Sequence, residues 1–203
     1  MTRRTAIFAA LFALQAGVTQ AQESTENGKA SFIFNGSRVL IGQNTQAATQ
    51  KAGVFAAIEP SCDPACIAPF EVAEGVKTVI EPEVLDFLVN GVGKNKGLLV
   101  DARMPEARKA GFIPGSVNLP HSTLAKDNAF RDQILTALGV RIFEDVFNFS
   151  DAQTLLIYDN GPSQNDAGGL ISNLLEAGYP AEKISYYRGG MQVWSVLALT
   201  VQE

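Results

Sequence analysis

The chain has 203 residues, of which 46% are hydrophobic and 18% are charged, and this is enough apolar material for one globular domain with extensions. It carries 16 basic and 21 acidic residues, for a formal net charge of -5. An acidic chain without a basic stripe argues against nucleic acid and anionic lipid surfaces as partners.

The first 21 residues have the pattern of a secretory signal peptide. A short positive region at Arg3-Arg4 precedes an apolar run that ends at Val18, and cleavage is predicted after Ala21. The alternative is a membrane anchor, but the run is shorter than the roughly 20 residues that span a bilayer. Cleavage leaves 14 basic and 21 acidic residues, a formal charge of -7. We therefore expect a soluble periplasmic or secreted protein that binds no membrane.

Residues 22–74 are predicted to form an N-terminal extension with a hairpin and a cysteine loop. Asn35-Gly36 separates two apolar runs and favours a hairpin, because both turn positions take positive φ. Cys62 and Cys66 are the two cysteines of the chain. In an oxidising compartment their spacing favours a structural disulfide. The alternatives are a redox-active or sulfur-carrying pair and a metal site, although zinc needs about four ligands.

From residue 75 onward, strands and helices alternate. Strands are expected at 77–80, 97–101, 115–120, 154–158 and 183–187, and helices begin near 81, 130, 165 and 190. The run 97–101 lacks polar alternation, which is typical of a sheet covered on both faces. This order predicts an α/β domain with a parallel sheet between helices. Loops that start at Asp101, Pro120, Asp159 and Arg188 should then gather at the carboxyl edge, where such sheets bind ligands.

Four motifs in this order resemble the rhodanese-like domain over about residues 75–203. Residues 99–103 resemble its Asp-x-Arg signature, 111–120 its Gly-His-Ile-Pro-Gly-Ala motif, 156–159 the strand before its active-site cysteine, and 188–194 its closing Gly-Gly-x-x-x-Trp motif. The N-terminal extension is similar to that of an exported subgroup with a CxxxC segment. The resemblance implies a three-layer α/β/α fold, no cofactor, and sulfurtransferase chemistry in which a loop cysteine carries a persulfide.

The chain departs from this family pattern at the catalytic loop. Asp159 stands where the family places its cysteine, and Phe112 stands in place of the family histidine. A carboxylate cannot hold sulfane sulfur, because a persulfide forms on a thiolate. The loop N–H groups and the next helix N-terminus could cradle an anion, but Asp159 brings its own negative charge and the loop has no lysine or arginine. The candidate ligand-loop residues are Asn160, Gly161, Ser163, Gln164 and Asn165.

The remaining singled-out side chains have mostly structural interpretations. Asp101 and Arg103 are predicted to form an ion pair that orders the pocket rim. Arg188 is expected at the same rim, in a surface salt bridge or in contact with an anion. His121 is interpreted as a solvated loop residue, and Trp194 as a core residue that seals the last helix.

Two interpretations of Asp159 remain open. As a nucleophile for phosphoryl transfer it would need Mg²⁺ ligands nearby, such as Asp101 and Asp166. In the simpler interpretation, it accepts hydrogen bonds from its own loop and holds the loop closed. We therefore predict an exported pseudoenzyme that holds no metal. It would act as a binding module, and its partner would be an unidentified protein or a small anion. The alternatives are a thiol redox or sulfur-relay protein that uses Cys62 and Cys66, and a residual sulfurtransferase.

Overall fold

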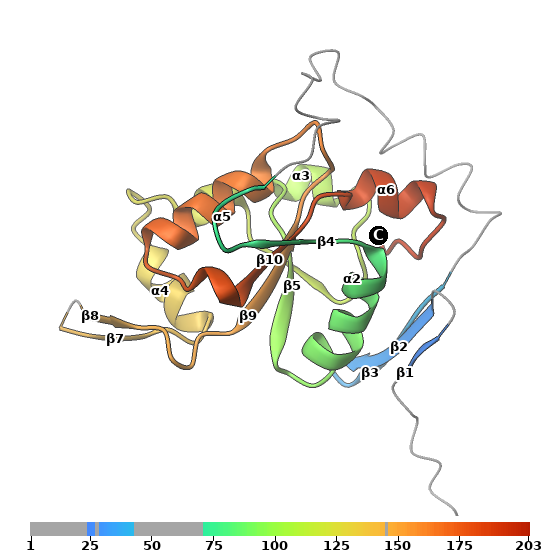
Figure 1. Cartoon of the computed structure of the whole chain (residues 1–203), viewed down its shortest axis with the longest axis horizontal. Coiled ribbons are helices and arrows are strands. Elements are labelled where there is room, and N and C mark those ends of the chain that lie inside the picture. The colour runs from blue at the N-terminus through green and yellow to red at the C-terminus, as the bar shows by residue number, and fades with distance from the viewer. Residues whose placement is uncertain (1–23, 27–28, 43–70, 145) are drawn as a thin grey trace, which may run out of the picture.

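A five-stranded parallel sheet forms the centre of the molecule in the computed structural model, which describes residues 24–26, 29–42, 71–144 and 146–203 (Figure 1). The strand order is β4-β10-β9-β5-β6, and every neighbouring pair is parallel. The parallel sheet confirms the α/β fold expected from the sequence. Because the strands are parallel, their carboxyl ends lie at one edge of the sheet. The strands are β4 (Lys77–Val79), β5 (Gly97–Asp101), β6 (Ser116–Asn118), β9 (Thr154–Tyr158) and β10 (Ile184–Tyr187).

Helices cover both faces of this sheet and give three layers. Successive side chains of a strand point to opposite faces, so Leu99 and Leu156 enter one core while Val100 and Ile157 enter the other. The first core is covered by α2 (Glu81–Phe87), the π-helical turn η2 (Leu88–Val92) and α6 (Gly190–Val196). The second is covered by η3 (His121–Leu124), α4 (Arg131–Ala137) and α5 (Asp166–Glu176). The short α3 (Pro105–Arg108) and η4 (Ala181–Lys183) lie in connections.

The N-terminal extension contributes a three-stranded antiparallel sheet that packs on the first core. Its strands are β1 (Ser24–Glu26), β2 (Lys29–Phe34) and β3 (Ser37–Ile41), and the predicted turn has φ of 48° at Asn35 and 74° at Gly36. The side chain of Phe32 is fully buried in the core that also contains residues of α2 and α6. Gly42 then exchanges two hydrogen bonds, of 3.0 and 2.9 Å, with the hydroxyl of Thr200. The extension is therefore joined to the α/β domain through shared packing.

Some local expectations were wrong in detail. Ile80 was assigned to a strand, but it precedes the first turn of α2 and is 61% exposed. A helix was expected to begin near residue 130; α4 begins at Arg131, and the apolar Phe130 just before it is 63% exposed. Lys183 belongs to η4 and not to the last strand, because its backbone N–H donates to the carbonyl of Pro180 at 3.0 Å and closes the turn. The hairpin of β7 (Arg141–Phe143) and β8 (Val146–Asn148) was not anticipated.

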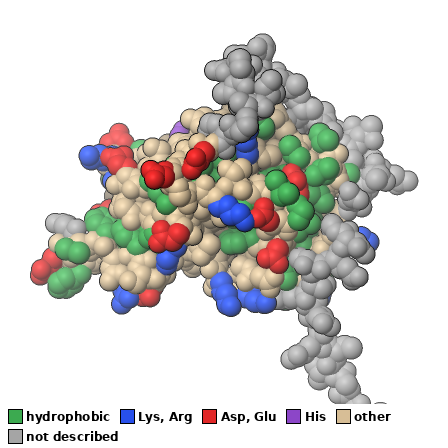
Figure 2. All heavy atoms as spheres, in the orientation of Figure 1, with side chains coloured by type: hydrophobic (Ala, Val, Ile, Leu, Met, Phe, Trp, Pro, Cys, Tyr) green, Lys and Arg blue, Asp and Glu red, His purple; other side chains and the backbone are tan. Residues whose placement is uncertain are grey.

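The predicted signal peptide, residues 1–21, and the pair Cys62 and Cys66 lie outside the described residues. Among the helices that the structure does describe, none combines the length and the apolar character needed to cross a membrane. On the face shown in Figure 2, acidic and basic side chains are interspersed with apolar ones.

Candidate functional site

The loops that follow four of the parallel strands meet at one edge of the sheet, as predicted. The N–H of Ala102 donates to the carbonyl of Tyr158 at 2.9 Å, and the N–H of His121 donates to the carbonyl of Ala102 at 3.1 Å. The N–H of Met191, in the first turn of α6, donates to the carbonyl of Asp159 at 3.1 Å. These backbone bonds hold the candidate site residues on a rigid frame.

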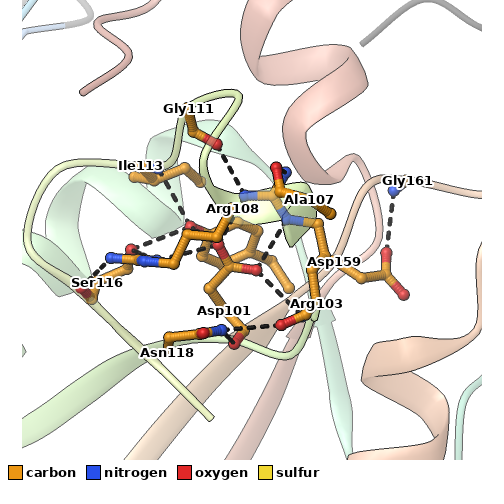
Figure 3. A network of polar contacts seen from close by, with 11 residues as sticks. Asp101, Arg103, Ala107, Arg108, Gly111, Ile113, Ser116, Asn118, Asp159 and Gly161 are labelled. Atoms are coloured by element: carbon orange, nitrogen blue, oxygen red, sulfur yellow. Dashed lines mark hydrogen bonds and ion pairs between the residues drawn. The ribbon is translucent and has the colours of Figure 1, made fainter. Parts of the chain in front are cut away.

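Asp159 closes its own loop. Its side chain is fully buried, and Oδ1 accepts the N–H of Gly161 at 2.9 Å (Figure 3). Oδ2 accepts the N–H of Ala167, in the first turn of α5, at 3.0 Å. Asn165 holds the usual N-cap position of α5 but makes no side-chain cap bond. Asp159 therefore supplies the cap from a distance, where a negative charge also favours the positive end of the helix dipole.

The protonation equilibrium of Asp159 reflects competing influences. Their net effect raises the pKa of the carboxyl from 3.8 to about 6, and burial is the largest cause. Within this net effect, the hydrogen bonds from Ala167 and Gly161 lower the pKa, and the negative charges of Asp166 and Asp101 raise it. The site therefore holds a carboxyl group that can exchange a proton near neutral pH.

The loop between β9 and α5 is packed tightly against the start of α6. Gly161 has φ of 141°, and a Cβ at this residue would lie 2.6 Å from Oε1 of Gln192. The N–H of Gln192 donates to the carbonyl of Asn160 at 3.0 Å, and the N–H of Gln164 donates to the carbonyl of Gly161 at 2.9 Å. The hydroxyl of Ser163 is buried and finds no hydrogen-bond partner among the described residues. The predicted ligand loop is therefore compact and is satisfied mainly by internal contacts.

Asp101 and Arg103 form the predicted ion pair, but they do not line a pocket rim. Asp101 accepts Nε of Arg103 at 2.8 Å and Nη2 at 2.6 Å, and the two side chains are 0% and 1% exposed. Nη2 of Arg103 also donates to the carbonyl of Gly111 at 2.9 Å (Figure 3). Burial alone lowers the pKa of Arg103, yet the hydrogen bonds and charge of Asp101 raise it above its ordinary value. The rim assignment was wrong because these partners allow the pair to sit inside the protein.

Arg108 is a member of this network that the sequence did not single out. Its Nη1 lies 3.0 Å from Oδ2 of Asp101 and 2.9 Å from the hydroxyl of Ser116. Its guanidinium carbon lies 3.7 Å from the ring centroid of Phe112, a distance suited to a cation–π contact. Its place at the end of the short helix after the Asp-x-Arg motif was the available signal. Phe112 therefore has a packing role against Arg108.

Tyr158, the last residue of β9, connects this strand to the buried cluster of Asp101, Arg103 and Arg108. Its hydroxyl lies 3.2 Å from Oδ2 of Asp101 and 3.0 Å from the hydroxyl of Ser116, and it accepts the N–H of Ile113 at 3.1 Å. Desolvation, with the charge of Asp101, raises the pKa of this phenol above its ordinary value. Tyr158 therefore stays neutral and serves as a buried brace between β9, β5 and the loop before β6.

The remaining predicted residues have distinct environments. Arg188 follows β10 directly and is partly buried, and its charge acts on the phenol of Tyr186. His121 is not simply solvated, because its Nδ1 lies 3.4 Å from Oδ1 of Asp166 although the side chain is 39% exposed. Trp194 is a core residue as expected, fully buried with Nε1 donating to the carbonyl of Thr200 at 2.8 Å.

The chemistry available at this edge follows from these contacts. Both oxygens of Asp159 are used as hydrogen-bond acceptors, and those of Asp101 face arginine side chains and the Tyr158 hydroxyl. In the ranges that the structure describes, no three His, Cys, Asp or Glu side chains are grouped as metal ligands would be. The carboxylates of Asp101 and Asp159 therefore act as hydrogen-bond acceptors in this arrangement.

One family and several solved structures are similar to this chain. The sequence profile of the family described as rhodanese-like domain matches residues 85–197. No protein with a curated description matches the chain. Similar solved structures include a human single-domain sulfurtransferase, 23% identical, covering 59% of this chain and 95% of that one with a TM-score of 0.40. A protein from Bacillus halodurans is 19% identical, with 62% of this chain and 76% of that one covered and a TM-score of 0.46. A rhodanese-related protein from Thermoplasma volcanium is 17% identical, with 62% of this chain and 97% of that one covered and a TM-score of 0.42.

Proposed function

The chain belongs to the rhodanese-like domain family, and we propose that it is an exported member without sulfurtransferase activity that acts as a binding or interaction module. Asp159 occupies the position at which the family carries its persulfide cysteine. One observation carries the proposal: the Asp159 carboxylate accepts the N–H groups of Gly161 and Ala167. The side chain that would receive sulfur is thus replaced by one that fills the loop itself.

Two physical arguments support inactivity at this loop. A carboxylate oxygen has no way to store sulfane sulfur, which requires a thiolate sulfur as acceptor. An incoming thiosulfate or sulfate ion would also compete with the Asp159 carboxylate for the same N–H donors, and it would meet the charge of Asp166 nearby. A small-anion partner is therefore less well supported than a protein partner.

A sulfur-transfer assay on the mature protein tests the proposal. The purified chain is incubated with thiosulfate and cyanide, and thiocyanate formation is measured. We expect no turnover above the uncatalysed rate in the wild type, in Asp159→Ala, or in Asp166→Ala, a control that removes a nearby, partly exposed acid. Turnover in the wild type that is lost in Asp159→Ala but retained in Asp166→Ala would overturn the proposal.

A labelling experiment separates this loop from the N-terminal thiols. The Cys62→Ser/Cys66→Ser variant is incubated with thiosulfate labelled at its outer sulfur and analysed by intact mass and by retained label. We expect no covalent sulfur, because this variant contains no other cysteine. Stable incorporation of label would show that another side chain accepts sulfur, and the inactive-scaffold account would fail.

A thiol redox or sulfur-relay function at Cys62 and Cys66 is the second candidate, motivated by the CxxxC pair beside a domain that is otherwise free of cysteine. Titration of the pair against glutathione buffers distinguishes it from a structural disulfide. A reduction potential below about -300 mV indicates an inert disulfide, whereas a higher potential supports the relay.

Export is tested by intact mass after expression of the full chain. Signal cleavage after Ala21 gives a soluble product that begins at Gln22 in the periplasmic or secreted fraction. A product that retains residues 1–21 in the membrane fraction would contradict this part of the proposal.

A further inference from the structure

The hairpin of β7 and β8 presents large apolar side chains to solvent. Its two strands form a sheet of their own, which extends from the α/β domain at the left of Figure 1. Phe143 and Val146 are direct cross-strand partners, and the two residues are 74% and 67% exposed. The next pair, Ile142 and Phe147, points to the opposite face and packs against the second core. The outer face of the hairpin is therefore apolar, although no described part of the fold covers it.

The inner side of the hairpin is held firmly. The ring of Phe147 stacks on that of Phe149 with 6.3 Å between centroids, and Phe149 makes an edge contact with Tyr179 at 5.6 Å. Just after β8, the ammonium group of Lys183 donates to the carbonyls of residues 149, 150 and 152 at 2.7 to 3.2 Å. A surface that is already fixed loses less conformational entropy when a partner binds. The two exposed apolar side chains are thus presented by strands that are already in place.

The turn of the hairpin adds negative charge to this surface. Residues 144 and 145 are both acidic, and Figure 2 shows acidic beside hydrophobic side chains at this end of the molecule. The basic side chains of the hairpin and of its inner contacts have other partners, since Arg141 pairs with Asp151 at 2.6 Å and Lys183 binds the three carbonyls. These groups therefore leave the negative charge of Glu144 uncompensated.

Apolar character and negative charge together indicate the chemistry of a partner. Exposed apolar side chains bind apolar side chains, and an acidic rim favours basic residues around them. A second copy of this chain fits poorly, because a two-fold contact between hairpins would bring Glu144 of each copy close to Glu144 of the other. Both copies would also carry a net charge of -5. The complementary partner is a protein segment with apolar residues next to lysine or arginine.

We propose that the outer face of the β7–β8 hairpin, Phe143 and Val146 with Glu144 beside them, is a docking surface for such a segment. The inference rests on the proposed role as an interaction module, and it adds where the partner binds and what the partner carries. Buried aromatic residues commonly dominate the binding energy of an interface, so Phe143 is the main expected contact. Because β8 leads into the amino end of β9, this surface is separate from Asp159 at the carboxyl end of that strand.

Selection from a phage-displayed library of random peptides tests the proposal without a known partner. The library is selected on the immobilised wild-type protein, and enriched peptides are synthesised and titrated by fluorescence anisotropy. We expect enriched peptides to combine apolar residues with lysine or arginine. They should bind Phe143→Ser at least about 10-fold more weakly than the wild type. Glu144→Gln should also weaken binding and reduce its dependence on salt.

Phe130→Ser is the matched control, because Phe130 is the same kind of side chain, 63% exposed, but lies before α4. It should leave binding of the selected peptides unchanged. Since Phe143 is exposed, Phe143→Ser should keep the wild-type Tm, which shows that lost binding is not lost folding.

Four results would overturn the proposal. They are a failure to enrich any peptide, enriched peptides without basic residues, equal affinity for Phe143→Ser and the wild type, and a dimer in light scattering that disappears in Phe143→Ser. The last result would assign the surface to a second copy. Peptides that bind independently of Phe143 would remove this surface but keep the interaction role, and none of these measurements depends on the sulfur-transfer assay.

Discussion

Replacing Asp101 by asparagine tests the buried charge network at the base of the site. Asp101 accepts two side-chain bonds from Arg103 and one from Arg108, at 2.6 to 3.0 Å, and Arg103 is 1% exposed. The variant keeps one oxygen and the side-chain volume but leaves a buried guanidinium charge unpaired. Breaking a buried pair in this way typically costs about 3–5 kcal/mol of unfolding free energy. For a protein of this size that corresponds to a fall in Tm on the order of 10 °C.

Urea unfolding followed by far-UV circular dichroism and by Trp194 fluorescence provides the measurement. The control is Asp151→Asn, which breaks an Arg141–Asp151 pair whose side chains are 65% and 63% exposed, and we expect it to cost less than about 1 kcal/mol. In a double-mutant cycle, Arg103→Met should recover part of the stability lost in Asp101→Asn, because it removes the unpaired charge. An Asp101→Asn cost no larger than that of Asp151→Asn would refute the reasoning.

Three further predictions concern the core, the loop and pH. Phe32→Ala should cost about 3–5 kcal/mol of unfolding free energy in urea, since this side chain is fully buried between the extension and the domain; a cost under about 1 kcal/mol would show that the extension is dispensable. Gly190→Ala should cost about 1–3 kcal/mol by the same assay, because φ is 54° and its Cβ would lie 2.5 Å from the carbonyl oxygen of Asp159; wild-type stability would contradict this. The raised pKa of Asp159 means that the folded state holds its proton longer, so stability should fall by up to about 3 kcal/mol as pH rises from 4 through 6. Thermal unfolding of Asp159→Asn across this pH range should show no such decrease in stability. If the stability of Asp159→Asn and of the wild type changes with pH in the same way, the prediction is refuted.

The arrangement of elements was predictable because it depends on local patterns. The apolar run 97–101 needs cover on both faces, and the parallel sheet provides it. Asn35-Gly36 specifies its turn through the positive φ of both residues, and the observed angles agree. By contrast, Phe130 has the apolar character of a core residue, yet it lies one position before α4 and stays exposed. Pattern alone does not fix which apolar side chains at a helix start are buried.

The candidate site was predictable in its residues but not in its geometry. The sequence placed Asp159 at the end of a buried strand and paired Asp101 with Arg103. It did not show that Arg108 joins the pair, or that Tyr158 braces the network across 57 positions of sequence. Such contacts depend on which strands are neighbours and on how far each side chain reaches. The spacing of residues along the chain specifies neither which strands are neighbours nor how far a side chain reaches.

The amino-acid sequence by itself determined the order of strands and helices, the family pattern, and the presence of a carboxylate, Asp159, directly after a buried strand, since these follow from side-chain chemistry and local periodicity. Only the tertiary structure decided what that carboxylate does. The N–H of Ala167 reaches Asp159 because α5 packs across the end of β9, and the loop closes because Gly161 turns back onto the same side chain. Burial then sets the proton affinity of Asp159, and burial is a property of the packed molecule as a whole.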